Sequence, residues 1–200
     1  MITTNVPAFH SQIRDSTSDL HAMLDQLPIS KKIVSADVTL EVYADYLQRL
    51  YRVHRSLEKN IFPLLTGLFT DLALRKKSDL ILNDLQSLNF TALAGSESLF
   101  EDSVSPSFAV GMCYVTEGST LGSRFILKNI VQSLHLSAHV ACKFLNGYGD
   151  TTGAMWKKFI DRMTSYADGV DMTEQSRIID GARFAFEQIH AELAHSSKSA

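Results

Sequence analysis

Apolar residues recur at intervals of three and four along most of this chain, and no stretch shows the strict alternation that marks a half-buried strand. The spacing predicts a first helix over about residues 9–27, which Pro28 ends. It predicts a second helix that begins at Thr39 and bends or ends at Pro63. The pattern therefore predicts an all-α protein.

The middle of the chain combines a short helix, a loop and the longest expected helix. A helix is expected over about 78–85, with the Ser-Asp pair at its start as the N-terminal cap. Residues 87–105 are rich in Ser, Gly and Asp and lack a period, which is typical of a loop. Ser105-Pro106 is a helix start signal, and the helix it opens is expected to reach about Leu134, interrupted by glycines in its middle.

The pattern in the last third of the chain predicts three more helices. Residues 137–146 are expected to form a short one, which Gly-Tyr-Gly at 147–149 breaks. Two longer helices over about 152–168 and 173–195 follow, and residues 196–200 read as a polar tail. Because no repeat or composition shift marks a boundary, residues 1–200 are expected to form a single domain of about seven helices.

Composition and charge exclude several classes of protein. The 200 residues are 45% apolar and 20% charged, as in ordinary globular domains. No run approaches the roughly 18 apolar residues of a membrane span, and the first ten residues lack a signal-peptide layout, so we expect a cytoplasmic protein with no membrane partner. A net charge of −3 gives no basic excess for nucleic acid. Cys113 and Cys142 form no CxxC pair, which indicates buried free thiols in a reducing compartment.

Arg14, His21 and Asp25 are expected on one face of the first helix. Positions seven apart differ by about 20° around a helix and lie roughly 10 Å apart along its axis, while positions four apart are neighbours. An imidazole beside a carboxylate is the arrangement of a metal-binding histidine, whose second ring nitrogen donates to an acceptor that fixes the tautomer. A cation two turns away could pair with an anionic edge of a large ligand. Taken alone, His21 and Asp25 are more simply explained as a surface pair.

The long helix carries three glycines in its interior, each of which costs roughly 1 kcal/mol relative to alanine. Besides Gly111, these are Gly118 and Gly122, which are four residues apart with Ser119 and Ser123 beside them. This strip lacks Cβ atoms at two positions and therefore lets a flat object approach the backbone closely. That object is either a neighbouring helix or a planar cofactor.

A di-iron carboxylate site in a helical bundle is a further alternative. Such sites use two Glu-x-x-His pairs and two more glutamates that face inward. The chain contains one such pair, Glu187 with His190, while His54 and Glu58 are four apart and Glu117 is isolated. The set is incomplete. No G-x-S-x-G elbow and no phosphate-binding loop are present either.

Two of these features together give the chain a likeness to a known family. They are the run LHAMLD at 20–25, with Arg14 seven residues before its histidine, and the run YVTEGSTLG at 114–122. In this order they resemble the haem oxygenases. The later run YGDTTG at 148–153, followed by Trp156, resembles in particular the bacterial branch that supplies biliverdin to bacteriophytochromes. The likeness covers most of the chain, and EGSTLG is its specific core.

The resemblance implies a helical fold in which haem b, at once substrate and cofactor, lies between the first helix and a glycine-kinked distal helix. It makes His21 the proximal iron ligand. Gly118 and Gly122 would then bring the distal helix close to the haem, with water near Ser119 delivering protons. The candidates for pairing with the haem propionates, and so for setting which bridge is cut, are Arg14, Lys157, Lys158 and Arg162.

The implied activity is the cleavage of haem with O₂ and external electrons to biliverdin, CO and iron. Because the chain has no nucleotide-binding fingerprint, the external reductant would be a partner such as a ferredoxin, a flavodoxin or a reductase. A bacteriophytochrome is a candidate receiver of the biliverdin. A haem-binding carrier or sensor on the same fold, and a di-iron oxidase, are the alternatives.

Two positions depart from patterns found in the family. Ser119 stands where the animal-type enzymes carry an aspartate that organises distal water, a difference shared with the bacteriophytochrome-linked branch. Gly122-Ser123 stands where many relatives have two glycines. The serine adds a hydroxyl and bulk, so the rate and the choice of bridge do not follow from the resemblance.

Overall fold

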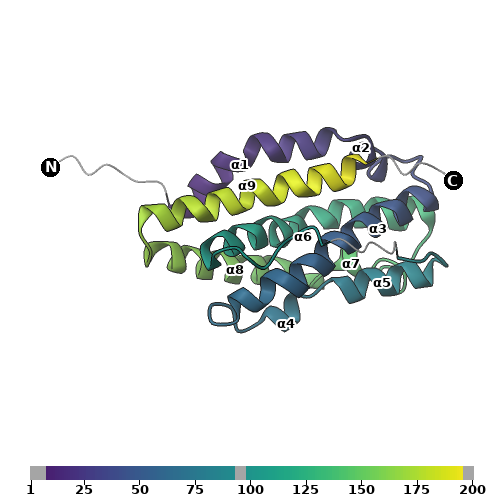
Figure 1. Cartoon of the computed structure of the whole chain (residues 1–200). Coiled ribbons are helices and arrows are strands. Elements are labelled where there is room, and N and C mark those ends of the chain that lie inside the picture. The colour runs from purple at the N-terminus through teal and green to yellow at the C-terminus, as the bar shows by residue number, and fades with distance from the viewer. Residues whose placement is uncertain (1–7, 93–97, 196–200) are drawn as a thin grey trace.

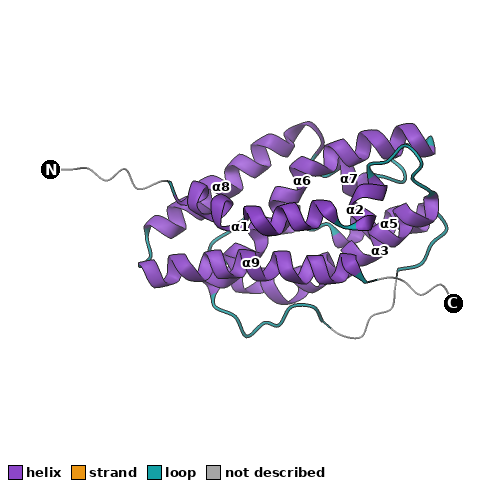
Figure 2. Cartoon of the chain, turned by 90° about the horizontal axis from the view of Figure 1, so that it is seen from above, coloured by secondary structure: helices purple, strands orange, loops and turns teal. Residues whose placement is uncertain are grey.

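A computed structural model describes residues 8–92 and 98–195 of the chain, and the described part is helical with no strand (Figure 2). The polar tail expected at 196–200 lies outside these residues. The α-helices are α1 (Phe9–Gln26), α2 (Pro28–Ile33), α3 (Leu40–Ser56), α4 (Leu72–Arg75), α5 (Ser78–Ser87), α6 (Pro106–Leu134), α7 (Lys143–Asn146), α8 (Thr152–Asp168) and α9 (Met172–Ala194). A π-helix η1 (Leu57–Ile61) and 3₁₀-helices η2 (Phe62–Leu65) and η3 (Gly149–Thr151) complete the order.

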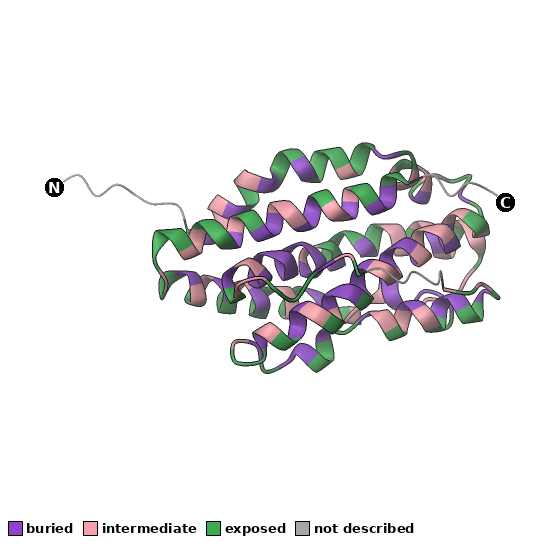
Figure 3. Ribbon diagram, viewed as in Figure 1, coloured by how far each residue is buried: buried purple, intermediate pink, exposed green. Residues whose placement is uncertain are grey.

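The helices surround one core whose centre is α6. Figure 1 shows α1 and α9 side by side, with α6 beneath α9 and α8 beyond α6. Helix α3 crosses the bundle and packs on α5 and α9. Every residue of α6 from Ala109 to Glu117 is buried, whereas its second half reaches the surface (Figure 3). Among the described residues, no helix is both long enough and apolar enough to cross a bilayer.

Two glycines set the close approach of α6 and α9. A Cβ atom at Gly111 would lie 1.8 Å from the carbonyl oxygen of Ile178, and one at Gly181 would lie 2.0 Å from that of Phe108. Each glycine therefore leaves the space that the backbone of the other helix occupies. Gly111 therefore makes room for a neighbouring helix, whereas the two alternatives drawn from the sequence concerned Gly118 and Gly122.

Several predicted boundaries are confirmed together with their caps. The Thr39 hydroxyl accepts from Val42 N–H at the start of α3, and the Ser105 hydroxyl accepts from Phe108 N–H at the start of α6. Pro28 ends α1 as predicted and also occupies the first position of α2, where its missing N–H costs nothing. Pro63 lies in η2, just after α3 has passed into the π-helix.

Three local predictions are wrong, and in each case a distant side chain or a neighbouring helix explains the difference. Helix α6 runs unbroken through its glycines, held between α8 and α9. Residues 137–146 form only the short α7, because the Asp84 carboxylate accepts from the N–H groups of Lys143 and Phe144 and so fixes the helix start there. The Ser-Asp pair at 78–79 does not cap α5, whose first N–H groups donate to the Glu58 carboxylate.

Candidate functional site

A cavity of about 730 Å³ opens between α1, α3, α6 and α9, within the usual size of a cofactor site. Its inner wall is formed by the buried residues Leu50, Val53, His54 and Phe144. Its rim carries exposed apolar side chains, of which Phe125 is 79% exposed. The polar residues that line it are His10, Arg14, Thr17, Ser18, His21, Asp25, Ser30, Tyr46, His54, Tyr114, Thr116, Ser119 and Ser123.

His21 and Asp25 form the predicted pair on the α1 wall of this cavity. Nδ1 of His21 lies 3.2 Å from Oδ2 of Asp25, and both side chains are about two-thirds exposed. The imidazole also meets the ring of Phe186 edge-on, with the ring centroids 6.0 Å apart. With Nδ1 directed at the carboxylate, Nε2 is the ring atom left to bind a ligand.

The two glycines of α6 that line the cavity differ in what surrounds them. A Cβ atom at Gly122 would meet no atom of the described residues within 4 Å, so this position opens onto free space in the cavity. A Cβ at Gly118 would lie 3.4 Å from the indole of Trp156, which itself lines the cavity. Gly122 therefore leaves room for a ligand, and Gly118 leaves room for Trp156.

The hydroxyl groups on this strip are partly engaged by their own helix. Ser119 Oγ donates to the carbonyl oxygen of Thr116 at 2.8 Å, and Ser123 Oγ donates to that of Ser119 at 3.0 Å. Each oxygen keeps lone pairs that can accept from water in the cavity. The catalytic role assigned to Ser119 stays a prediction.

Of the four basic residues predicted to pair with propionates, the structure brings one to the cavity. Arg14 lies on its wall and pairs with Asp15 at 3.2 Å. Lys157 pairs with Asp161 at 2.6 Å on the outer side of α8. Lys158 and Arg162 line a separate hollow of about 250 Å³, where Lys158 pairs with Asp71 at 3.0 Å. Lys157, Lys158 and Arg162 are not among the cavity-lining residues of the described chain.

Two residues that line the cavity, Tyr114 and His54, were not predicted from the sequence as haem-site residues. Tyr114 lies one turn before Gly118, and its ring is 5.6 Å from that of Trp156, centroid to centroid. His54 is only 5% exposed, and the ring of Phe144 packs edge-on against it at 5.2 Å. A signal existed for His54, since it follows the buried apolar positions Leu50 and Val53 on α3.

A buried network of charges supports α6 on the side away from the cavity. The Glu117 carboxylate pairs with Arg75 and accepts from the Tyr148 hydroxyl at 2.9 Å, while Arg75 also pairs with Asp71 at 2.9 Å. Burial raises the pKa of Glu117, and the Arg75 charge opposes that rise. The network therefore fixes the helix immediately before Gly118.

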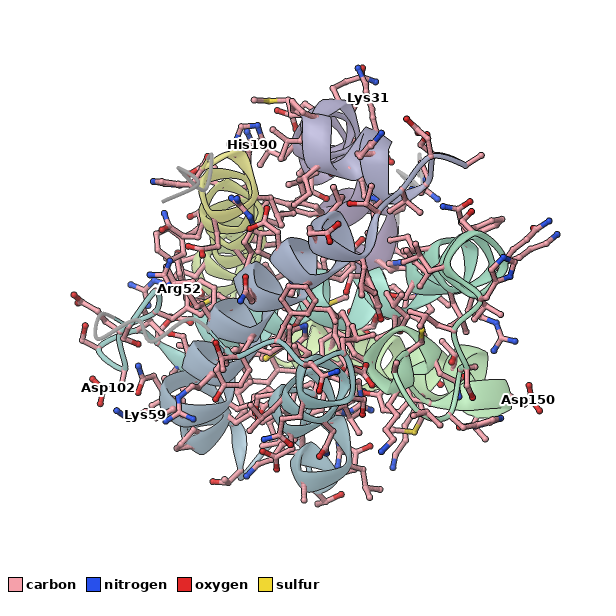
Figure 4. All side chains as sticks on the ribbon, turned by 90° about the vertical axis from the view of Figure 1, so that its right-hand side faces the viewer. Lys31, Arg52, Lys59, Asp102, Asp150 and His190 are labelled. Atoms are coloured by element: carbon pink, nitrogen blue, oxygen red, sulfur yellow. The ribbon has the colours of Figure 1, made fainter. Side chains whose placement is uncertain are left out.

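The residues considered for a di-iron site are not brought together. Glu58 binds the first N–H groups of α5, and Glu117 belongs to the charged network. His190 lies on the outer side of α9 (Figure 4). In the described ranges, no three His, Cys, Asp or Glu side chains gather in a way that could hold a metal ion.

Comparisons with known proteins agree on one family. The family model described as Heme oxygenase matches residues 7–92 and 93–194. Heme oxygenase PigA of Pseudomonas aeruginosa is 27% identical over 179 residues, which span 86% of this chain and 84% of that protein. The NO- and CO-bound heme oxygenase of Neisseria meningitidis has the same fold, with a TM-score of 0.78 and 19% identity over 97% of this chain and 96% of that one. Heme oxygenase-1 of Synechocystis, solved with heme, gives 0.70 and 18% over 93% and 90%.

Proposed function

The chain belongs to the haem oxygenase family, and from this premise we propose how its residues hold haem and direct its cleavage. It is a haem-degrading enzyme whose substrate and cofactor is haem. The products in our proposal are biliverdin, CO and iron. The observation that carries the site assignment is the His21–Asp25 pair on one wall of a cavity whose other wall contains Gly122.

The cavity suits haem in size, lining and shape. Its volume of about 730 Å³ and its largely apolar walls suit a planar, largely apolar macrocycle. The open space at Gly122 would be filled by any side chain larger than hydrogen. Exposed apolar residues at the rim, such as Phe125, would be covered by a bound haem.

His21 is the proposed proximal ligand, bound through Nε2. The Asp25 carboxylate accepts from the Nδ1 side, which fixes the ring tautomer and makes the free nitrogen a better donor to iron. Phe186 limits rotation of the imidazole from the other side. Bound haem supplies the iron that activates O₂ and the ring that is cut.

The α6 wall is the proposed distal side. Gly122 has no Cβ, so the backbone of α6 can lie close to the haem at this position. The close backbone then limits the space for molecules that approach the haem from this side. Ser119 and Ser123 keep acceptor sites that can hold water along the strip. Gly118 contributes indirectly, because it seats Trp156 at the end of the cavity.

Arg14 is the proposed propionate partner on α1. Its guanidinium is exposed at the cavity wall and could exchange Asp15 for a carboxylate of the ligand. Tyr114 lines the same cavity from α6 and adds a hydroxyl donor. We do not assign the propionates to Lys157, Lys158 and Arg162. The bridge that is cut would then depend on where Arg14 and Tyr114 hold the haem edge.

Electrons are proposed to come from an external reductant. Support for this comes from the sequence, which has no nucleotide-binding fingerprint, so a ferredoxin, a flavodoxin or a reductase is the partner we propose. Delivery of biliverdin to a bacteriophytochrome, membership of the branch linked to it, and a cytoplasmic location stay predictions.

The assignment of His21 is tested by haem binding rather than turnover. Ferric haem is titrated into the wild type, into His21→Ala and into the control His190→Ala, whose histidine lies on the outer side of α9. We expect the axial-histidine spectrum in the wild type and in the control, and its loss in His21→Ala with the helical circular dichroism unchanged. An axial-histidine spectrum that survives in His21→Ala would show that another residue binds the iron.

Turnover separates the enzyme from a haem carrier or sensor on the same fold. Supplied with reductant and O₂, an oxygenase loses its haem absorption as the red-absorbing product grows. A carrier keeps its haem band through the same treatment.

A further inference from the structure

Lys77 is a buried lysine whose ammonium group rests on an aromatic ring. The residue is 3% exposed, and its Nζ lies 3.4 Å from the centroid of the Tyr148 ring. The face of an aromatic ring attracts a cation but carries no net charge that could neutralise it. Within the described part of the chain, no ion pair includes Lys77.

The contacts of Lys77 reach two of the elements that form the cavity. Its backbone N–H donates to Oε1 of Glu58 at 2.6 Å, and Glu58 lies one turn after His54 of the inner wall. The hydroxyl of Tyr148 donates to Glu117 at 2.9 Å, and Glu117 shares α6 with the glycines that line the cavity. Lys77 therefore lies behind the cavity lining, close to the inner wall and to α6.

The charge of Lys77 acts on a side chain of the cavity wall. Burial, assisted by this charge, lowers the pKa of His54 to about 3. His54 is 5% exposed and lines the inner wall. Because both residues are buried, solvent screens their interaction less than it screens two surface charges. The positive charge of Lys77 therefore acts on the inner end of the cavity.

The other charged groups that face Lys77 have partners of their own. Burial lowers the pKa of Lys77 to about 8, with Glu117 and Glu58 opposing the fall and Arg75 adding to it. Glu117 pairs with Arg75, and Glu58 accepts from the N–H groups of Lys77 and Ser78. At pH 7 Lys77 thus carries a positive charge that no single neighbour cancels.

We propose that Lys77 raises the reduction potential of the haem iron held in the cavity. The proposal rests on the proposed function, because it takes haem as the ligand and the transfer of external electrons to its iron as part of the reaction. A nearby positive charge favours the state that holds the additional electron, so it stabilises ferrous relative to ferric haem. Lys77 then makes electron transfer from the reductant more favourable without touching the haem.

The test compares two substitutions of Lys77 with a matched control. Lys77→Met removes the charge at similar length, Lys77→Arg keeps the charge, and Lys76→Met removes the charge of the neighbouring, exposed lysine. Urea unfolding of the haem-free proteins shows that each variant folds before haem is added.

The first readout is the midpoint potential of the bound haem at pH 7, measured by spectroelectrochemistry. At a fixed solution potential we expect the ratio of ferrous to ferric haem to fall roughly tenfold in Lys77→Met, which lowers the midpoint by about 59 mV. Lys77→Arg and Lys76→Met should keep the wild-type midpoint.

The second readout is the dependence of this midpoint on pH, which a packing role would not change. Lys77 loses its proton near pH 8, so the midpoint of the wild type should fall as the pH rises from 7 to about 9. An arginine keeps its charge throughout this range, so Lys77→Arg should lack that part of the fall.

The outcomes separate this inference from the proposed function. A Lys77→Met protein with the wild-type midpoint overturns the role of Lys77 and leaves the His21 assignment intact. An equal fall in Lys76→Met assigns the effect to surface charge, and an equal fall in Lys77→Arg assigns it to packing, so either result overturns the inference. If the wild type takes up no ferric haem, the proposed function is wrong and this inference is wrong with it.

Discussion

Nδ1 of His21 lies 3.2 Å from Oδ2 of Asp25, one helical turn further along α1. This contact lets a single helix orient the proposed haem ligand, because both residues lie on the same helical backbone. Neither side chain needs a partner from elsewhere in the fold to form the pair. The cavity then adds what the pair lacks, which is a distal wall and an enclosed space.

Replacing Asp25 with Asn tests the second ring nitrogen of the ligand. The amide no longer attracts the Nδ1 proton as a carboxylate does, so we expect haem affinity or turnover to fall roughly 10–100-fold. The measurement is a haem titration followed by turnover. Asp19→Asn is the matched control, since Asp19 is on the same helix and pairs with Arg183 outside the cavity. Equal losses in the two variants would contradict the assigned role of Asp25.

A methyl group at Gly122 separates stability from ligand fit. Gly122→Ala is expected to raise the free energy of unfolding by up to about 1 kcal/mol, because alanine favours the helix and meets no atom within 4 Å. The same methyl group enters the part of the cavity that we propose haem occupies, so haem affinity should fall. Gly153→Ala on α8 also meets no atom and is not on the cavity wall. It should stabilise the protein without weakening haem binding, which chemical unfolding and haem titration of both variants will show.

The crossing of α6 and α9 should not tolerate a side chain. In Gly111→Ala or Gly181→Ala the new Cβ would lie about 2 Å from a carbonyl oxygen of the other helix, so the two helices must separate. We expect a loss of about 3 kcal/mol or more of unfolding free energy. Urea unfolding measures it, with Gly67→Ala as the control at an uncrowded glycine. A wild-type stability for either variant would show that the helices are further apart than described.

The stability of the haem-free protein should depend on pH through His54. Its pKa is about 3 in the folded state and near 6.5 when unfolded, so the unfolded chain binds the extra proton as pH falls. Folding therefore loses about 1.4 kcal/mol per unit below pH 6.5, or roughly 2 kcal/mol by pH 5. His54→Leu should lack this part of the loss. Unfolding titrations of both proteins at pH 7.5 and pH 5 provide the comparison, and identical losses would rule out a buried neutral imidazole.

Much of the fold follows from local signals. Thr39 and Ser105 cap the helices they were expected to start, and Pro28 ends the first helix, because each acts on N–H groups within its own turn. The pair of His21 and Asp25 was likewise predictable, since four residues is one turn. Where a single helix determines the geometry, the sequence is sufficient.

Features that depend on distant residues could not be predicted in this way. Asp84 fixes the start of α7 from some sixty residues away, and Glu58 caps α5 from about twenty residues away. Gly181 is explained only by the backbone of Phe108. His54 looks like one more position on the inner face of α3 until the packing shows that the cavity lies beside it.

The three glycines inside α6 combine a feature that the sequence shows with one that only the packing shows. The sequence shows that these positions lack Cβ atoms, but it does not show which group occupies the space. In the structure Gly111 contacts α9, Gly118 contacts Trp156 and Gly122 borders the cavity. Three similar residues in one helix therefore serve three different neighbours.

The central claim is that this cavity binds haem and that the protein cleaves it. The most direct measurement is absorption spectroscopy of the purified protein, first titrated with ferric haem and then given a ferredoxin system or ascorbate under O₂. We predict one haem per chain, followed by loss of the haem band and growth of a red-absorbing product in step with CO release. A stable haem band with no product under the same conditions would contradict the account.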